Sequence, residues 1–173
     1  EELIKEEKVV NFASPSNNFV VVAGGPGAGK SFITKNLINL DNVKDFNVDQ
    51  VRVMTAKKLW GDEWEEMIST QPINVVYDAG GGQEQVMKDV HELAKDNGFN
   101  TTLVHVRTPL ELAQIRNDER PRSLPDGMVA QYHQKVKDNM RNMIPIFDNV
   151  WTVDNKEIID LSDRPSDNIE KIK

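Results

Sequence analysis

The sequence predicts an α/β fold in which a five-stranded parallel sheet carries helices on both faces. Three observations predict it: short apolar runs recur along the chain, stretches with helical spacing separate them, and a glycine-rich turn follows the first run. The runs are continuous rather than alternating, which is typical of strands buried on both faces. Strands that alternate with helices imply right-handed crossovers and a doubly wound sheet. The predicted strands are residues 19–23, 45–49, 73–77, 101–106 and 150–153.

The segments between these strands carry the helical signals. Thr108 is expected to cap the helix after the fourth strand, with Pro109 at its first position and Glu111 at its third. The tail after the fifth strand is polar. Helices are also predicted over residues 30–40, over residues 51–70 in two pieces broken at Gly61, and along the apolar stripe of residues 128–143. A further helix carries an apolar stripe over residues 86–94 and ends at residues 97–98.

Length and charge limit the classes of function. A chain of 173 residues suits one compact domain, and we expect a polar lead-in over residues 1–18 followed by a single domain over residues 19–173. The net charge of -7 means that the overall field does not attract a long polyanion. Nucleic acid would therefore have to be bound by a local cluster of cations.

The chain contains no cysteine, which excludes disulfides, thiolate metal sites and a cysteine nucleophile. His91, His105 and His133 show no paired metal-ligand spacing and are expected to be core or surface residues. No apolar run reaches the roughly 18 residues of a membrane helix. These features predict a cytoplasmic protein that does not bind membranes, and they carry no signal for its oligomeric state.

The strongest motif follows the first strand. Residues 24–31 read GGPGAGKS and match the phosphate-binding pattern G-x-x-x-x-G-K-[ST] in full. Its glycines let successive amides point at phosphate oxygens, and the helix that begins near Gly29 adds its positive end. The motif predicts the three-layer P-loop NTPase fold with ATP and Mg²⁺ as cofactors. The predicted nucleotide-binding residues here are Gly25, Pro26, Gly27, Ala28, Gly29, Lys30, Ser31 and Phe32.

Within this motif, Lys30 is predicted to be catalytic because its ammonium can reach the β- and γ-phosphates. The Ser31 hydroxyl is a predicted Mg²⁺ ligand. Asp78 ends the third strand, beside the phosphate loop, and is the second predicted metal ligand. Ligands in doubly wound sheets lie at the carboxyl ends of the strands, where all three residues are expected.

Two further residues follow the second strand. Asp49 ends that strand and is the predicted general base, which accepts the proton of an attacking hydroxyl. Arg52 lies three residues later and is predicted to contact an acceptor phosphate or to stabilise charge. A monophosphate acceptor would need no base, so Asp49 favours a hydroxyl acceptor.

A cation-rich segment follows the fourth strand, and residues 109–125 are predicted to form a lid. Arg116 and Arg120 are four residues apart and are expected on one helix face, with Arg122 as a third candidate. Arg116 and Arg120 are predicted both to bind the nucleotide and to act in catalysis. Arginines on a closing lid stabilise transferred charge and help to exclude water.

Together these segments resemble the P-loop kinases that include phage polynucleotide 5′-hydroxyl kinases and zeta-toxin-type kinases. The resemblance covers residues 19–153 and rests on GGPGAGKS, DQVR, YDAGG and RNDERPR. It implies that Asp49 is the catalytic base, that Arg52 contacts an acceptor phosphate and that the arginines after strand four form the lid. Those kinases often carry Thr or Asn after the strand-three acid, whereas residues 79–82 here read AGGG.

The predicted activity is Mg-ATP-dependent transfer of the γ-phosphate to a hydroxyl group. Candidate acceptors are a nucleic-acid 5′-hydroxyl, a modified base, a nucleoside or nucleotide, and a small sugar-like molecule. Trp60 and Trp64 could stack on a base or pack on the sheet. Two alternatives stay open, a GTPase-like switch and a non-catalytic nucleotide-binding module. Residues 78–81 match the GTPase pattern D-x-x-G, but the segment that begins at Asn155-Lys156 lacks the closing Asp of an Asn-Lys-x-Asp loop.

Overall fold

The computed structural model describes residues 10, 12, 14, 17–38, 40, 43–46, 74–155 and 169–173. In this part of the chain, none of the helices is long and apolar enough to cross a bilayer. The elements, in chain order, are β1 (Asn18–Ala23), α1 (Lys30–Leu37), β2 (Val43–Phe46), β3 (Asn74–Gly80), α4 (Glu84–Asp96), β4 (Asn100–Arg107), α5 (Leu110–Asp118), α6 (Met128–Met143), β5 (Asn149–Asp154) and β6 (Ile169–Lys171).

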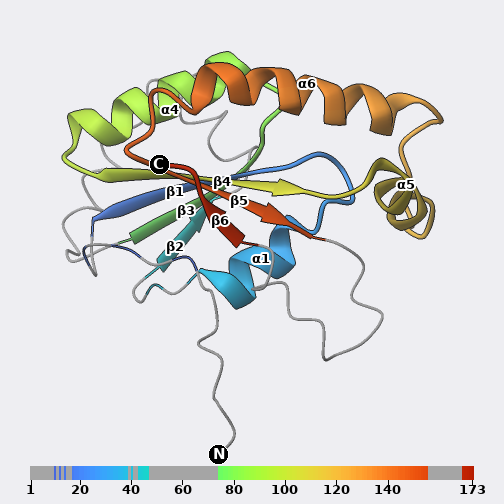
Figure 1. Cartoon of the computed structure of the whole chain (residues 1–173), viewed down its shortest axis with the longest axis horizontal. Helices are drawn as coiled ribbons and strands as arrows, with labels where there is room; N and C mark the ends of the chain where they lie inside the picture. The colour runs from blue at the N-terminus through green and yellow to red at the C-terminus, as the bar shows by residue number, and fades with distance from the viewer. Residues whose placement is uncertain are drawn as a thin grey trace, which may run out of the picture.

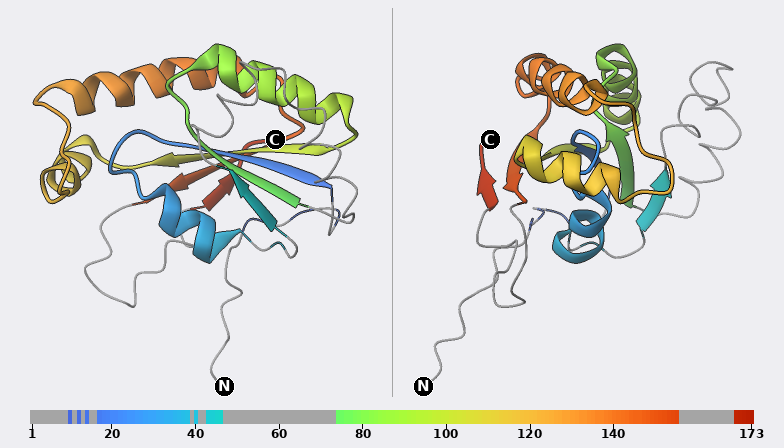
Figure 2. Two further views of the ribbon diagram at one scale, coloured as in Figure 1. Left: turned by 180° about the vertical axis from the view of Figure 1, so that it is seen from behind. Right: turned by 90° about the vertical axis from the view of Figure 1, so that its right-hand side faces the viewer.

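The described strands form one twisted sheet in the order β2-β3-β1-β4-β5-β6. The pairs among β1 to β5 are parallel, and only β6 runs antiparallel to its neighbour. Helices α4 and α6 cover one face of the sheet and α1 covers the other, while α5 lies at the end toward which the parallel strands point (Figures 1 and 2). The predicted three-layer α/β fold is confirmed.

Strand β6 corrects the prediction of a fully parallel, five-stranded sheet with a polar tail. Its three residues carry no apolar pattern, so periodicity gave no signal for a strand. The segment is held by pairing instead: it runs antiparallel to β5, and the Val150 amide donates to the Lys173 carbonyl at 3.0 Å. The Lys171 ammonium also lies 5.9 Å from the centre of the Trp151 ring.

Each face of the sheet has its own apolar core. On the α4 and α6 side, Tyr77, Met87, Met140 and Phe147 are among the buried residues, and on the α1 side Val10, Val22, Ile33 and Val104 are. Every residue of β1 is buried, as its continuous apolar pattern predicts. The predicted lead-in contributes as well, because Val10 is fully buried and pairs with Ile38 beside α1. The central strand is therefore held from both sides.

Two strand boundaries in the described part of the chain differ from the prediction by two or more residues, and the others by at most one. β2 begins at Val43 rather than at residue 45, and the residues after Phe46 lie outside the described part of the chain. β3 does not end at Asp78 but continues to Gly80, because Ala23 pairs with Gly80 and the Gly24 amide donates to the Gly80 carbonyl at 2.9 Å. A strand edge set by pairing with a distant segment has no local sequence signal.

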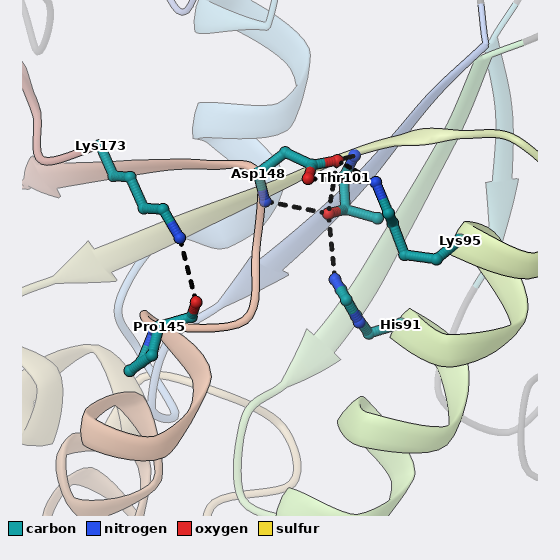
Figure 3. Close-up of polar contacts among 6 residues, drawn as sticks. All are labelled: His91, Lys95, Thr101, Pro145, Asp148 and Lys173. Carbon is teal, nitrogen blue, oxygen red and sulfur yellow. Dashed lines mark hydrogen bonds and ion pairs between the residues drawn. The ribbon is translucent and has the colours of Figure 1, made fainter.

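A polar cluster at the far end of the sheet ties α4, β4 and the turn before β5 together (Figure 3). Asp148 accepts hydrogen bonds from the Lys95 ammonium at 2.8 Å and from the Thr101 amide at 3.0 Å, and the Thr101 hydroxyl in turn lies 3.1 Å from the His91 ring. Burial alone would raise the pKa of Asp148, but the bonds from Lys95 and Thr101 outweigh it and lower that pKa below its usual value of 3.8.

This cluster generates a stability prediction. A carboxylate whose pKa is lowered by folding stabilises the fold above its unfolded pKa and loses that contribution as the pH falls through the folded pKa. Asp148→Asn should therefore lower the free energy of unfolding by about 0.5–1 kcal/mol at pH 7, a small value because the pair is partly exposed. Urea denaturation from pH 7 to pH 3 should show the difference shrinking at low pH. A difference that does not vary with pH would contradict this role.

Candidate functional site

A cleft of about 730 Å³ lies where the loops that follow β1 and β3 meet. It is lined by four cationic side chains and one carboxylate, although the whole chain has a net charge of -7. Such a concentration of positive charge in an acidic protein favours a polyanionic ligand. The charged lining residues are Lys30, Asp78, Arg120, Arg122 and Lys135.

The phosphate loop, residues 24–31, forms one wall of this cleft. Two of its carbonyls are bonded to helices outside the loop. The Pro26 carbonyl accepts from the His133 ring on α6 at 2.8 Å, which requires the tautomer protonated on Nε2. The Gly27 carbonyl accepts from Arg116 Nη1 on α5 at 3.0 Å. These carbonyls therefore do not point into the cleft.

The next carbonyl is held at the ends of β4 and β5. Ala28 accepts from the buried Asn155 side-chain amide at 2.8 Å. The Thr108 hydroxyl lies 2.9 Å from the Ala28 carbonyl and 3.0 Å from the Asn155 carbonyl, so its one proton serves these two acceptors. Three successive carbonyls of the phosphate loop are thus anchored by four side chains from three different parts of the fold.

Because the Pro26 and Ala28 carbonyls are held outward, the Gly27 and Gly29 amides of the same peptide units face the opposite way, whereas the Ala28 amide donates to the Gly25 carbonyl at 3.1 Å. Among the described residues, the amides of Gly27, Gly29 and Lys30 donate to no protein group. Gly27 and Gly29 have φ angles of 75° and 87°, in the left-handed region that side chains disfavour. Gly29 directly precedes α1, so the positive end of that helix adds to the same site. The arrangement fits an anion that accepts several hydrogen bonds.

Lys30 lies within this wall, and its ammonium donates to the Gly24 carbonyl at 3.0 Å. Burial lowers the pKa of Lys30, the nearby Asp78 carboxylate raises it, and Arg120 lowers it further. The ammonium is therefore partly desolvated and close to an opposite charge. A bound phosphate would supply the hydrogen-bond acceptor that the Gly24 carbonyl now supplies.

A β-bulge sets the position of Asp78. Val22 pairs with Asp78 and Ala23 pairs with Gly80, so Ala79 has no partner on β1. Bulges of this kind redirect side chains next to functional sites. One Asp78 oxygen lies 3.3 Å from the Gly80 amide, and the residue lines the cleft together with Lys30.

The two arginines predicted on one helix face are separated. α5 ends at Asp118, so Arg120 lies beyond its end, where the following Pro121 disfavours a helical conformation. Arg116 stays on α5 and holds the Gly27 carbonyl, whereas Arg120 lines the cleft. The two arginines therefore do not share a helix face: Arg116 contacts the phosphate loop, and Arg120 borders the cleft.

A short loop carries Arg120 and the third arginine, Arg122, into the cleft. The buried side chain of Asn117 closes this loop. It donates to the Leu124 carbonyl at 3.1 Å and accepts from the Leu124 amide at 3.0 Å. This paired contact fixes the two ends of the segment that contains both arginines.

Not every predicted residue is placed in the cleft by the structure. Asp49, Arg52, Trp60 and Trp64 are outside the described part of the chain. Phe32 is 43% exposed and is not among the residues that line the cleft. Ala28 is buried and does not line the cleft. The other predicted residues of the phosphate loop line it, namely Gly25, Pro26, Gly27, Gly29, Lys30 and Ser31.

The three histidines have structural environments. His91 contacts Thr101, His133 holds the Pro26 carbonyl, and burial lowers the pKa of His105 to about 4. His105 is therefore uncharged at pH 7. Within the described ranges, no three His, Asp or Glu side chains are grouped closely enough to hold a metal ion. A cation in the cleft would need ligands from the bound phosphates as well as from Ser31 and Asp78.

Three anchoring residues were not predicted as such. Thr108 was expected to cap α5, but α5 begins at Leu110 after Pro109, and the Thr108 hydroxyl is directed to Ala28 and Asn155 instead. Thr108 and Asn155 each directly follow a parallel strand, which is where the strand-end rule places ligand-binding residues. His133 lies inside a helical stripe, where the sequence gives no signal for its contact with the loop.

The close packing of Gly25 generates a prediction. A Cβ at Gly25 would lie only 2.5–2.6 Å from His133 ring atoms, although the Gly25 backbone itself accepts a side chain. Gly25→Ala should therefore weaken binding of Mg-ATP by about tenfold, since overpacking typically costs about 1–3 kcal/mol. Isothermal titration calorimetry measures the change, and thermal unfolding shows whether the variant folds.

A second variant provides the control for Gly25→Ala. His133→Ala removes the obstructing ring and one hydrogen bond, which should cost about 1 kcal/mol by itself. In that background, Gly25→Ala should cost much less than it does alone, which a double-mutant cycle measures directly. Equal costs in the two backgrounds would mean that the ring does not set the loop position.

Comparison with known proteins places this site in a family. A solved structure from the PezAT chromosomal toxin-antitoxin system of Streptococcus pneumoniae superposes with a TM-score of 0.56 at 16% identity, over 94% of this chain and 74% of that chain. Structures of the AvrRxo1-ORF1:ORF2 complex with sulphate ions and with ATP give TM-scores of 0.56 and 0.54 at 17% identity. This chain is matched over 81% of its length there and spans 55% of the other chain.

These likenesses show the fold alone, which agrees with the three-layer α/β arrangement and the phosphate loop described above. The family comparison is more extensive, because the AAA domain model matches residues 19–142 and so includes β1, the phosphate loop and most of α6. The chain therefore belongs to the AAA domain family.

Proposed function

We propose that this protein is a Mg-ATP-dependent kinase that transfers the γ-phosphate to a hydroxyl group. The proposed acceptor is a nucleic acid, through a 5′-hydroxyl or a modified base, or a nucleoside or nucleotide. Residues 19–173 form the proposed kinase domain, with residues 109–125 as its lid. The resemblance to polynucleotide and zeta-toxin-type kinases supports this assignment.

One observation carries the proposal: the phosphate loop, Lys30, Asp78 and Arg120 border a single cleft. Phosphoryl transfer needs little covalent chemistry from the protein and depends on positioning and charge stabilisation. The loop amides and Lys30 supply both for a triphosphate. Arg120, on the loop closed by Asn117, supplies a positive charge for the phosphoryl group in transit. The AvrRxo1 complex solved with ATP supports ATP as the nucleotide.

The residues at the cleft also fit Mg²⁺. Ser31 is an exposed residue in the first turn of α1, and Asp78 supplies a carboxylate, so both offer the oxygen ligands that Mg²⁺ prefers. Ser31 and Asp78 would hold the ion, which would supply positive charge to neutralise that of the phosphates. Asp49 and Arg52 remain the proposed base and acceptor-phosphate contact.

Transfer of labelled γ-phosphate tests the proposal directly. The protein is incubated with labelled ATP, Mg²⁺ and a panel of 5′-hydroxyl oligonucleotides, base-hydroxymethylated DNA, nucleosides and nucleotides. We expect strong labelling of one acceptor class, dependent on Mg²⁺. Lys30→Ala should reduce the rate by about 10²- to 10³-fold, because it removes a charge that stabilises the transferred group.

A matched substitution guards against general damage. Lys88 is a partly exposed lysine on α4 that pairs with Glu84 at 3.6 Å and does not line the cleft, so Lys88→Ala should leave the rate within twofold. Binding of Mg-ATP without transfer to any member of the panel would favour a non-catalytic nucleotide-binding module. Activity that survives Lys30→Ala would contradict the assigned role of the loop.

A further inference from the structure

We propose that Tyr132 and Lys135 on α6 form an acceptor-binding wall of the cleft, and that the acceptor combines a planar ring with its own phosphate. The ligand class is thus a phosphorylated nucleotide unit, either a mononucleotide or the end of a strand. This inference rests on the proposed kinase function and names the chemistry that its second substrate must have.

The cleft has cations beyond those that the triphosphate uses. Lys30 lies in the phosphate loop, and Arg120 contributes to the electrostatic environment of Lys30. Arg122 and Lys135 also line the cleft, and among the described residues neither forms an ion pair. Lys88, Lys95 and Arg107, which lie outside the cleft, pair with carboxylates. Unpaired cations in a cleft are suited to a second anionic group.

Tyr132 supplies an aromatic surface beside the glycine-rich turn. Tyr132 is 39% exposed, whereas Val129 and Val136 on the same helix are buried. A Cβ at Gly82 would lie 3.8 Å from the Tyr132 ring, and both residues line the cleft. The missing side chain at residue 82 therefore leaves space next to the ring. A planar ring in that space can stack on Tyr132, as bases stack on aromatic side chains in single-strand binding.

The position of α6 relative to this turn is fixed. Asn139 donates to the Gly81 carbonyl at 2.9 Å. A Cβ at Gly81 would lie 3.0 Å from Ala23 and 3.2 Å from Val136, so glycine lets the helix approach this closely. Gly81 also has a φ of 94°, which disfavours a side chain. Tyr132, Lys135 and Val136 are thereby held against the glycine turn.

The strand order places this wall on the acceptor side. The phosphate loop follows β1, which lies between β3 and β4. The loop is anchored at the β4 and β5 ends through Thr108 and Asn155, whereas the glycine turn follows β3, next to β2. In-line transfer requires donor and acceptor on opposite sides of the γ-phosphate. The acceptor therefore occupies the β3 side, where Gly82, Tyr132 and Lys135 border the cleft.

Steady-state kinetics on matched acceptors test the inference. Thymidine, thymidine 3′-monophosphate and 5′-hydroxyl oligonucleotides share a hydroxyl and a ring but differ in phosphate. We expect kcat/KM to be at least about tenfold higher for the phosphorylated acceptors than for thymidine. If kcat/KM rises with the length of the oligonucleotide, the acceptor is the end of a strand. If kcat/KM for thymidine 3′-monophosphate equals that for the oligonucleotides, the acceptor is a mononucleotide.

Lys135→Gln should remove most of this preference, raising KM for phosphorylated acceptors by about tenfold while the KM for ATP stays within twofold. Lys137→Gln is the control, because Lys137 is an exposed lysine on the same helix that does not line the cleft. An unchanged preference in Lys135→Gln, or a rise in the KM for ATP instead, would overturn the assignment.

Two ring variants test the stacking surface. Gly82→Val fills the space beside Tyr132 at a residue without a positive φ, and should raise acceptor KM while Mg-ATP binding is kept. Tyr132→Leu should raise acceptor KM more than Tyr132→Phe, which keeps the ring. Transfer to no acceptor at all would contradict the proposed kinase. Transfer that none of these variants affects would contradict only this wall.

Discussion

The outward anchoring of the phosphate-loop carbonyls is the constraint on which the rest of the site depends. His133, Arg116, Thr108 and Asn155 hold three successive carbonyls of this loop away from the cleft. The Pro26 and Ala28 carbonyls share their peptide units with the Gly27 and Gly29 amides, which point the opposite way and donate to no described protein group. The hydrogen bonds outside the cleft therefore orient these two amides toward a ligand inside it. Each bond is worth only about 1 kcal/mol, but together they select one loop conformation.

The sheet supports this anchoring because Thr108 and Asn155 directly follow β4 and β5, which belong to the same sheet as β1. β1 is buried throughout and has an apolar core on each face. Asn155 follows β5, and its backbone amide donates to the Arg107 carbonyl at 2.7 Å. This hydrogen bond joins the ends of β4 and β5 beneath the loop. The same geometry gathers cations on one cleft of an acidic protein, which concentrates the attraction for anions where the amides converge.

The sequence predicted those features whose signals are local. The glycine-rich motif located the phosphate loop, and continuous apolar runs located the parallel strands, because both depend on neighbouring residues alone. Features set by distant partners were missed. β3 extends to Gly80 through its pairing with β1, β6 forms only against β5, and Thr108 bonds to Ala28 rather than capping α5. The roles of Asp49 and Arg52 remain predictions, because both lie outside the described residues.

The most direct test follows the amide resonances of an isotope-labelled sample during titration with Mg-ATP. If the loop presents its amides as described, the largest changes should occur at Gly27, Gly29 and Lys30, and Asn155→Ala should weaken them by removing one of the two hydrogen bonds that hold the Ala28 carbonyl. Saturating Mg-ATP that leaves these amides unchanged, or that shifts only residues away from the cleft, would contradict the account.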